Sequence, residues 1–298
     1  MKELMLGNQA VARGLWQAGC RVVSSYPGTP STEITEYASG YPEVYTEWAP
    51  NEKVAYEVAM GAAIGGARAL CAMKHVGLNV AADPLFTTAY TGVGGGMVAA
   101  VADDPGMHSS QNEQDSRRYA VAAKLPMLEP ADSQECASYT AEAFRLSEEY
   151  DTPVLLRLTT RIAHARGVSH SQSLVELEER QEPPLRDYQK DPGKYVMMPA
   201  NAKKRRATVE ERMAALARLA EVTTLNRVEE GSDRRVGVIT AGICYQYVRE
   251  AMPDAPVLKL GLLNPLPVEL IRRFAATVDE GVVAEELDPV IQSHCAAI

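Results

Sequence analysis

The sequence predicts an α/β protein with a doubly wound parallel sheet and a second, smaller α/β domain. Helical patterns alternate with short apolar strands over residues 1–165, and the alternation resumes at residue 236. The strands are almost purely apolar, which is typical of parallel strands that helices cover on both faces. The length of 298 residues agrees with two domains, because domains commonly have about 150 residues.

Five strands are predicted within residues 1–165. Each is a short apolar run bounded by turn residues or by the end of a helix. Together they give a parallel sheet as the core of the first domain. Their ranges are 21–26, 44–48, 67–73, 97–103 and 153–159.

Capping signals place the helices between these strands. Asn8 and Asn51 are predicted N-caps, because an asparagine side chain accepts a hydrogen bond from a free amide of the first helical turn. Asp132 and Glu135 have the spacing of a capping box at the start of a helix over 133–150. Other helix boundaries are predicted near Gly19, Pro30, Gly40 and Gly66, and DPLFTTAYTG (83–92) is predicted to be helical.

One uncharged run, residues 84–102, has nearly the length of a membrane span. It contains four glycines and three threonines and is followed by Asp103 and Asp104, which is unfavourable for a membrane helix. We therefore expect a helix, a glycine-rich turn and a buried strand, and no membrane as a partner. The turn GVGGGM (92–97) lacks the spacing of a dinucleotide-binding loop and precedes a strand, so nucleotide binding is not favoured there.

Residues 166–235 are polar and are predicted to be a linker with one helix, from about Val209 to Leu225. The basic run KKRR (203–206) is interpreted as a solvated surface turn. Over residues 236–298 strands and helices alternate again, which predicts a second α/β unit that we expect to be incomplete. Its strands are VGVITAG (236–242), APVLKLGLL (255–263) and GVVAEEL (281–287).

Charge and cysteine usage exclude several classes of function. Lys plus Arg number 30 and Asp plus Glu 39, and the net charge of −9 argues against nucleic acid as a partner. The five cysteines are far apart and include no C-x-x-C pair, which argues against a disulfide framework and against an iron–sulfur or zinc centre in this chain. This usage, and an N-terminus without an apolar signal core, predict a cytoplasmic protein.

Polar residues are concentrated where the predicted strands end. In open parallel sheets, ligands bind beyond the carboxyl ends of the strands, so this edge is the predicted site. The opposite edge carries mostly helix-ending glycines. The residues at the carboxyl ends are Thr29 in YPGTP, Glu52, Lys74, His75, Asn79, the pair Asp103–Asp104, and His108.

These residues have structural as well as functional interpretations. His75 and His108 are candidates for acid–base chemistry because histidine titrates near neutral pH, although a loop histidine is more often a plain surface residue. Glu52 is either a functional carboxylate or one that the helix dipole favours. Asp103 and Asp104 are either metal ligands or caps of the next turn, since neighbours in a strand point to opposite faces.

Several long stretches carry a recognisable pattern: YPGTPSTEI, EWAPNEKVAYEVAMGAA, MKHVGLNVAADPL, ADDPGMHSSQNEQDSR, PVLLRLTTRIAHAR, LKLGLLNPLP and VVAEELDP. Together they cover nearly the whole chain. They resemble the thiamine-diphosphate-dependent 2-oxoacid:ferredoxin oxidoreductases, and within that family the N-terminal part of the alpha subunit of the indolepyruvate type.

The resemblance implies a fold and an activity. Residues 1–165 would be the pyrimidine-binding domain for thiamine diphosphate, and residues 236–298 would resemble the transketolase C-terminal domain. Members of the family oxidatively decarboxylate a 2-oxoacid to an acyl-CoA and reduce ferredoxin, and the indolepyruvate type takes aryl pyruvates. The expected partners are therefore a 2-oxoacid, CoA, ferredoxin and a second subunit, and a homo-oligomer is expected.

The resemblance also implies roles for single residues. Glu52 matches the family glutamate that bonds to the pyrimidine N1′ and so promotes removal of the thiazolium C2 proton. The arginine that related pyruvate enzymes carry after the fourth strand is absent, because residues 102–104 read Ala-Asp-Asp. The implied assignments are Glu52 and His75 to catalysis, Gly28, Glu52 and Asn79 to the cofactor, and Thr29, Lys74 and His108 to the substrate.

Part of the family's machinery does not occur in this sequence. There is no Gly-Asp-Gly-like motif for Mg²⁺ and the diphosphate, and no cysteine-rich ferredoxin-like segment. We therefore expect half of a thiamine diphosphate site, with Mg²⁺ and [4Fe-4S] on a missing region or a partner chain, and no activity of this chain alone. It would be a fragment or a split subunit. The alternatives are a non-catalytic binding or assembly protein of the same fold and another thiamine-dependent transferase or decarboxylase.

Overall fold

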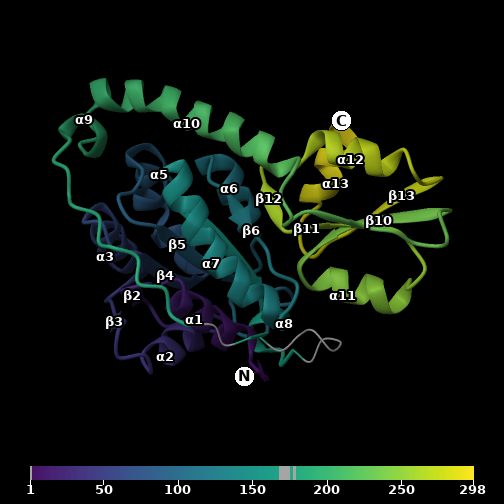
Figure 1. Ribbon diagram of the computed structural model, residues 1–298, viewed down its shortest axis with the longest axis horizontal. Coiled ribbons are helices and arrows are strands. Elements are labelled where there is room, and N and C mark those ends of the chain that lie inside the picture. Colours follow the sequence, from purple (N-terminus) through teal and green to yellow (C-terminus); the bar gives the residue numbers. More distant parts are fainter. Residues whose placement is uncertain (1, 168–174, 177–178) are drawn as a thin grey trace.

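Two sheets organise the protein, whose computed structural model describes residues 2–167, 175–176 and 179–298 (Figure 1). The larger sheet has seven strands in the order β12-β6-β7-β5-β4-β2-β3, and the smaller has four in the order β13-β10-β11-β9. A further short pair joins β1 (Lys2–Glu3) to β8 (Val175–Glu176). The predicted α/β class, with a parallel sheet and a second, smaller unit, is confirmed.

The larger sheet is parallel except at one edge, where β12 runs antiparallel to β6. All five strands predicted in this part of the chain are present. β6 was not predicted, because two residues are too few for a periodic signal. The strands are β2 (Val22–Ser25), β3 (Tyr45–Trp48), β4 (Ala69–Lys74), β5 (Met97–Asp103), β6 (Met127–Leu128), β7 (Val154–Thr159) and β12 (Leu262–Asn264).

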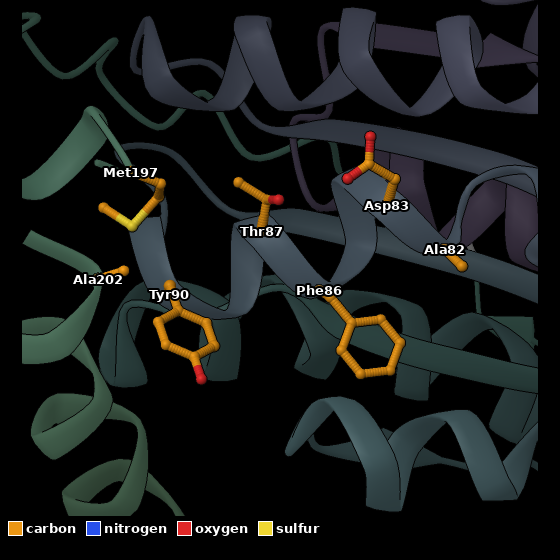
Figure 2. Close-up of a pocket in the computed structure, with 7 residues that line it drawn as sticks. All are labelled: Ala82, Asp83, Phe86, Thr87, Tyr90, Met197 and Ala202. Atoms are coloured by element: carbon orange, nitrogen blue, oxygen red, sulfur yellow. The ribbon is translucent and has the colours of Figure 1, made fainter. Parts of the chain in front are cut away.

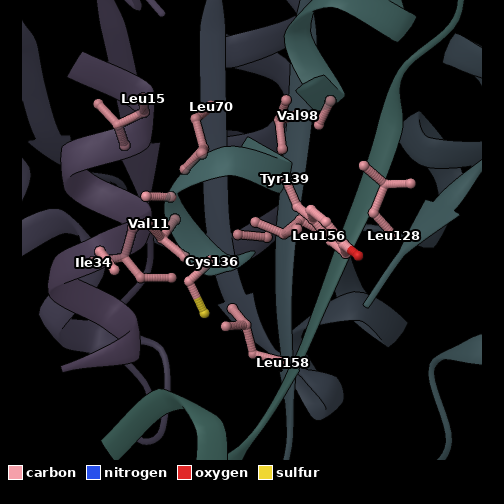
Figure 3. Packing of buried hydrophobic residues seen from close by; sticks show 14 of the residues in the cluster. Val11, Leu15, Ile34, Leu70, Val98, Leu128, Cys136, Tyr139, Leu156 and Leu158 are labelled. Carbon is pink, nitrogen blue, oxygen red and sulfur yellow. The ribbon is translucent and has the colours of Figure 1, made fainter. Parts of the chain in front are cut away.

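Helices cover both faces of this sheet, and alternate strand residues supply the two apolar layers. Leu156 and Leu158 of β7 belong to one layer and Leu155 to the other. Figure 3 shows the first layer, where Val11 and Cys136 lie among these leucines. This layer contains α1 (Gly7–Gln17), α2 (Thr32–Ala38) and α7 (Ser133–Tyr150), and the other contains α3 (Glu52–Ile64), α5 (Ala82–Thr91) and α6 (Arg117–Ala123).

Two of the three predicted caps are correct. The side chain of Asn51 accepts a hydrogen bond from the amide of Val54, and that of Asp132 accepts one from the amide of Glu135. Asn8 is not a cap. It lies inside α1, buried, and its amide group donates to the carbonyl of Pro30 and to Glu33. The predicted cap is wrong because the carbonyl of Pro30, 22 residues away, determines the direction of the Asn8 amide group.

The smaller sheet is built from β9 (Arg227–Glu229), β10 (Val236–Ala241), β11 (Val257–Leu260) and β13 (Glu280–Ala284). β10 is parallel to both β11 and β13, whereas β9 pairs antiparallel with β11. Three helices pack with it: α11 (Gly242–Ala251), α12 (Val268–Ala275) and α13 (Val290–Ala297). β9 lies within the interval that the sequence assigned to a linker.

The run APVLKLGLL is two strands and not one, which corrects the prediction. β11 ends at Leu260 in the smaller sheet, and β12 begins at Leu262 in the larger sheet. The break falls at Gly261, where a Cβ would lie 2.4 Å from the hydroxyl of Tyr139. The amides of Gly261 and Leu262 donate to the side chain of Asn226. Strand pairing therefore crosses the proposed boundary between the two domains.

The helix in the interval 166–235 is longer than predicted. α10 spans Pro199–Ala220 and contains KKRR, so the predicted surface turn is wrong. Tertiary partners explain the extra turns. Arg205 donates to the carbonyl of Tyr90 and contacts Asp151, and Arg212 donates to the carbonyl of Ala89 and to Asp151 at 2.5 Å. These arginines bind α10 to the end of α5. A short helix, α9 (Pro192–Tyr195), precedes α10.

The segment before α9 lies against the glycine-rich edge of the larger sheet. Gly19, with φ 71°, leaves no room for a Cβ, which would lie 2.4 Å from Pro183. Gly66, with φ 98°, accepts a hydrogen bond from the amide of Arg186, and a Cβ there would lie 1.8 Å from the Arg186 carbonyl oxygen. The glycines at this edge thus end helices and also let the passing chain approach.

The uncharged run 84–102 consists of most of α5, a turn that begins at Gly92 with φ 69°, and most of β5. This arrangement agrees with the prediction of a helix, a glycine-rich turn and a buried strand. Every residue of β5 is buried. Within the described part of the chain, the search for a helix both long enough and apolar enough to span a membrane finds none.

Candidate functional site

The predicted site residues gather at the carboxyl edge of the larger sheet. β3 ends at Trp48 just before α3, and β4 runs directly into the short helix α4 (His75–Val80). β7 runs directly into α8 (Thr160–His164), and β5 ends in the loop that carries His108. The polar ends of these parallel strands therefore share one edge, as the sequence predicts.

Glu52 is held at this edge by α3 and α4. It is the first residue of α3, after the cap Asn51, and its side chain is half-buried. The side chain lies against Gly77, where a Cβ would be only 2.5 Å from Oε1 and Cγ of Glu52. Within residues 2–167, 175–176 and 179–298 its carboxylate has no hydrogen-bond or ion-pair partner. A half-buried carboxylate without a partner is available to a ligand.

Cys71 of β4 lies close enough to Glu52 for an electrostatic interaction between the two side chains. The thiol is fully buried, and burial raises its pKa, with the negative charge of Glu52 adding to the shift. A thiol in this state is not a nucleophile.

Gly28 and Lys74 form a second contact at the edge. The Cγ and Cδ atoms of Lys74 lie 3.2 and 3.3 Å from the position of a Cβ at Gly28, so a larger residue would press on the lysine stem. The amide of Gly28 donates to the hydroxyl of Thr32 at 2.9 Å. The ammonium group of Lys74 is paired with none of the described residues and is a free cation close to the YPGTP turn.

His75 is buried, with 1% of its surface exposed. Its Nε2 lies 3.0 Å from the carbonyl oxygen of Asn112, and Nδ1 has no partner in the structure as described. The ring therefore holds the loop that follows β5 and does not open onto the edge. A catalytic role for His75 stays a prediction.

Asn79 and Thr29 are both exposed. Asn79 lies in α4, and its side-chain oxygen accepts a short hydrogen bond from the hydroxyl of Tyr119. The carbonyl of Thr29 accepts a hydrogen bond from the hydroxyl of Ser109 at 3.0 Å. This bond joins the YPGTP turn to the loop after β5.

Asp103 and Asp104 divide their roles as neighbours in a strand do. Asp104 accepts from the hydroxyl of Thr160 at 2.6 Å and from the amide of Ser109 at 2.8 Å. Burial disfavours the ionised form of Asp104, but these hydrogen bonds outweigh that effect and lower the pKa of Asp104 to about 2. It caps the turn, as one of the two interpretations predicts. Among the residues whose structure is described, no group of three or more His, Cys, Asp or Glu side chains is arranged to hold a metal.

Asp103 belongs to a buried ionic network that the sequence did not reveal. Its Oδ2 lies 2.7 Å from Nε of Arg157, and Nη1 of Arg157 lies 2.7 Å from Glu129. Both Asp103 and Arg157 are fully buried. Burial is the main cause that raises the pKa of Asp103, although the guanidinium of Arg157 opposes the shift. The sequence signal that could have indicated this network is the arginine within the mostly apolar strand PVLLRLT.

Arg117 extends this network to the smaller sheet. It pairs with Asp115 at 2.6 Å and with Glu285, which follows β13, also at 2.6 Å. It donates to the backbone carbonyls of Glu286 and Asp288 at 2.7 and 2.8 Å. The stretches ADDPGMHSSQNEQDSR and VVAEELDP are therefore in direct contact. One buried arginine fixes the end of β13 against the edge that carries the site.

Two cavities lie near these elements. A cavity of about 320 Å³ opens beside His108, between the loop after β5, α8 and α11. Figure 2 shows a second pocket along α5, of about 390 Å³, into which none of the predicted site residues points. Its lining is mostly apolar and consists of Ala82, Asp83, Phe86, Thr87, Tyr90, Met197 and Ala202.

A parallel α/β sheet with free polar groups at its carboxyl edge defines a ligand-binding domain of the doubly wound class. The family model described as pyruvate flavodoxin/ferredoxin oxidoreductase, thiamine diP-binding, matches residues 13–232. The chain belongs to this family of thiamine diphosphate-binding domains.

Curated relatives agree with this family. The chain is 44% identical to the indolepyruvate oxidoreductase subunit IorA of Archaeoglobus fulgidus, in an alignment that covers 100% of this chain and 49% of that protein. It is 45% identical to the subunit of the same name from Methanothermobacter thermautotrophicus, with 100% and 48% covered. A 2-oxoglutarate synthase subunit KorA from Methanothermobacter marburgensis is 29% identical, with 64% and 52% covered. The chain spans about half the length of the curated relatives it matches.

Solved structures share the fold. A 2-oxoglutarate:ferredoxin oxidoreductase from Magnetococcus marinus aligns with a TM-score of 0.79 at 21% identity, over 99% of this chain and 59% of that one. A split-gene transketolase aligns with a TM-score of 0.60 at 17% identity, over 98% and 84%. At these identities the comparison concerns the fold alone. Both structures span the two sheets of this chain.

Proposed function

We propose that this chain supplies the pyrimidine side of a thiamine diphosphate site in a 2-oxoacid:ferredoxin oxidoreductase of the indolepyruvate type. The observation that carries the proposal is the unpaired, half-buried carboxylate of Glu52, held against Gly77 at the carboxyl edge of the sheet. The family match and the relatives named indolepyruvate oxidoreductase subunit support it.

The residues at this edge fit a thiamine pyrimidine ring. Glu52, in the first turn of α3, offers an acceptor that no described donor occupies. Its role is to accept a hydrogen bond at N1′ of the ring. When bound, the cofactor supplies the electron sink that a decarboxylation requires. Gly28 and Asn79 are the further residues that we assign to the cofactor.

Thr29, Lys74 and His108 are the residues that we assign to the 2-oxoacid. Lys74 is an unpaired cation of this edge among the described residues, so its ammonium group is a candidate partner of the substrate carboxylate where residues 102–104 offer no arginine. His75 takes the role of a positioning residue in this proposal. Its buried ring holds the Asn112 carbonyl and with it the loop that carries His108.

The rest of the enzyme lies outside this chain in our proposal. Mg²⁺, the diphosphate-binding region and [4Fe-4S] clusters belong to the region that the relatives have beyond this chain, or to a partner chain. CoA, ferredoxin, a second subunit and a further copy of the enzyme are the proposed partners. The proposed compartment is the cytoplasm, where the five free cysteines stay reduced.

Two other functions can be distinguished from this one by their turnover and by the substrates that it requires. A non-catalytic assembly protein of the same fold would bind a partner without thiamine-dependent turnover. A thiamine-dependent transferase would turn over without CoA and without an electron acceptor. The transketolase-like fold is the observation that favours this second candidate.

The test is reconstitution with the missing region and the second subunit. Reduction of ferredoxin by indolepyruvate, CoA and thiamine diphosphate is expected for the wild-type chain. Glu52→Gln should lower the turnover by on the order of 100-fold or more, because an amide cannot hold a proton at N1′ as a carboxylate does. Glu57→Gln is the matched control, since Glu57 is exposed on the same helix. Near wild-type turnover of Glu52→Gln would overturn the assignment.

A further inference from the structure

The cavity beside His108 lies where the two bodies of the protein meet. His108 and Pro105 come from the loop after β5, and Tyr247 comes from α11 of the smaller body. Its volume is about 320 Å³, at the lower end of the range for ligand pockets, which is about 300–1,000 Å³. The full lining is Pro105, His108, Thr160, Arg161, His164, Ala165, Tyr247 and Glu286.

Hydrogen-bond donors dominate this lining. Arg161 and His164 lie on α8, and His108 and Tyr247 join the lining from the loop after β5 and from α11. The guanidinium of Arg161 and the ring of His108 have no hydrogen-bond or ion-pair partner among the residues that the structure describes. A guanidinium presents a planar set of donors that matches the oxygens of a phosphate or a carboxylate.

The acidic groups near the cavity do not pair with Arg161. Asp104 accepts hydrogen bonds from Thr160 and from Ser109, so its oxygens are satisfied inside the turn. Glu33 lies 3.4 Å from Nε2 of His164 and is directed at that ring. Glu286 also lines the cavity, but among the described residues no ion pair or hydrogen bond joins it to Arg161.

Hydrogen bonds and an ion pair restrain two segments of the cavity wall. The bond from Ser109 to the Thr29 carbonyl holds the loop after β5. Arg117 holds the chain around Glu286 through its backbone carbonyl at 2.7 Å and through Glu285 at 2.6 Å. A preorganised pocket loses less free energy on binding than one that must form around its ligand.

We propose that this cavity is an oxyanion-binding site, with Arg161 as the main ligand and His108 and Tyr247 as further donors. Its ligand carries a phosphate or a carboxylate group. In this enzyme class such a group belongs either to a phosphorylated coenzyme or to an organic acid substrate. The site shares His108 with the residues assigned above to the 2-oxoacid. A carboxylate ligand would therefore rest on the proposed function and deepen it, whereas a phosphate ligand would go beyond it. Neither ligand involves Glu52.

Isothermal titration calorimetry of the whole chain tests this site, with inorganic pyrophosphate and pyruvate as separate probes at constant ionic strength. We expect one of them to bind with a dissociation constant of about 1 mM or lower. Arg161→Gln should weaken that binding by about tenfold or more, because it removes a charged donor. The matched control is Arg273→Gln, since Arg273 is an exposed arginine of α12 that does not line the cavity.

The outcomes separate the possibilities. Binding of pyrophosphate that Arg161→Gln weakens assigns the site to a coenzyme phosphate, and the same result with pyruvate alone assigns it to a carboxylate. Glu52→Gln should leave either binding unchanged, so a failure of the proposed thiamine site does not affect the result. No binding of either probe, or equal binding by wild type and Arg161→Gln, would overturn the proposal.

Discussion

The side chain of Glu52 occupies the space that a side chain at Gly77 would fill. A Cβ at Gly77 would lie 2.5 Å from Oε1 and from Cγ of the glutamate. Glu52 begins α3, and Gly77 is the third residue of α4. The helix that follows β4 thus determines where the carboxylate that follows β3 is held.

Gly77→Ala should therefore impair the enzyme through Glu52. The added methyl group displaces the carboxylate, and a displacement of about 1 Å can cost on the order of 100-fold in rate. We expect a loss of this size in thiamine-dependent turnover of the reconstituted enzyme, with little change in the midpoint of thermal unfolding, since the displaced atoms are the end of a flexible side chain.

Gly61→Ala is the control for this prediction. Gly61 lies in α3, and a Cβ there would have no atom within 4 Å. Its substitution should leave the turnover unchanged and stabilise the helix slightly. If Gly77→Ala and Gly61→Ala had equal turnover, the contact between Glu52 and Gly77 would not contribute to catalysis.

The position of Glu52 was predictable because the signals for it are local. Asn51 is an N-cap, and the carboxyl edge follows from parallel pairing. The assignment of Glu52 to the cofactor came from the family resemblance and stays a prediction. The contact with Gly77 was not predictable, because it joins residues 25 positions apart in two helices whose packing no local pattern specifies. The same limitation explains why the predicted cap at Asn8 is wrong, since its amide binds the distant Pro30 carbonyl.

Strand β12 and the Arg157 network were missed for a related reason. APVLKLGLL reads as one apolar run, and only the contacts of Gly261 with Tyr139 and Asn226 divide it between two sheets. Arg157 lies in a strand that is otherwise apolar, and its carboxylate partners come from β5 and from the residue after β6. The charges that neutralise one another come from three different segments of the chain, so the sequence of any single segment does not reveal the ion pairs.

Arg157→Met should destabilise the fold strongly. It leaves Asp103 and Glu129 buried without their cation, and breaking a buried ion pair in this way costs about 3–5 kcal/mol. Urea unfolding followed by circular dichroism measures the change. Arg145→Met is the control, because Arg145 forms only exposed pairs on α7, which contribute about 1 kcal/mol or less. Equal midpoints for the two variants would contradict the prediction.

Arg117→Gln should loosen the smaller body without unfolding the larger one. The substitution removes the ion pair with Glu285 and weakens the bonds to the carbonyls of Glu286 and Asp288. We expect amide hydrogen exchange in β13 to become about tenfold faster or more, while exchange in β5 is unchanged. Arg118→Gln is the control, since it removes only the exposed pair with Asp288. Unchanged exchange in β13 would show that other contacts hold this strand.

Asp104→Asn should change how stability depends on acid. The hydrogen bonds from Thr160 and Ser109 lower the pKa of Asp104 to about 2, below its ordinary value of 3.8. A carboxyl whose pKa falls on folding contributes stability that is fully present above its ordinary pKa. This contribution is lost as the pH falls through the folded-state pKa. The free energy of unfolding of the wild type should therefore drop more steeply than that of Asp104→Asn between about pH 5 and pH 2.

The measurement is urea unfolding at several pH values across this window. Near neutral pH the variant should be less stable than the wild type, because the neutral amide accepts from Thr160 and Ser109 more weakly than a carboxylate does. The two curves should converge towards pH 2, where the wild-type carboxyl becomes protonated. Asp233→Asn is a useful comparison, since Asp233 has a similarly low pKa, of about 2, but its partner is the exposed Arg235. Its acid dependence should diminish in high salt, whereas that of the buried Asp104 should persist.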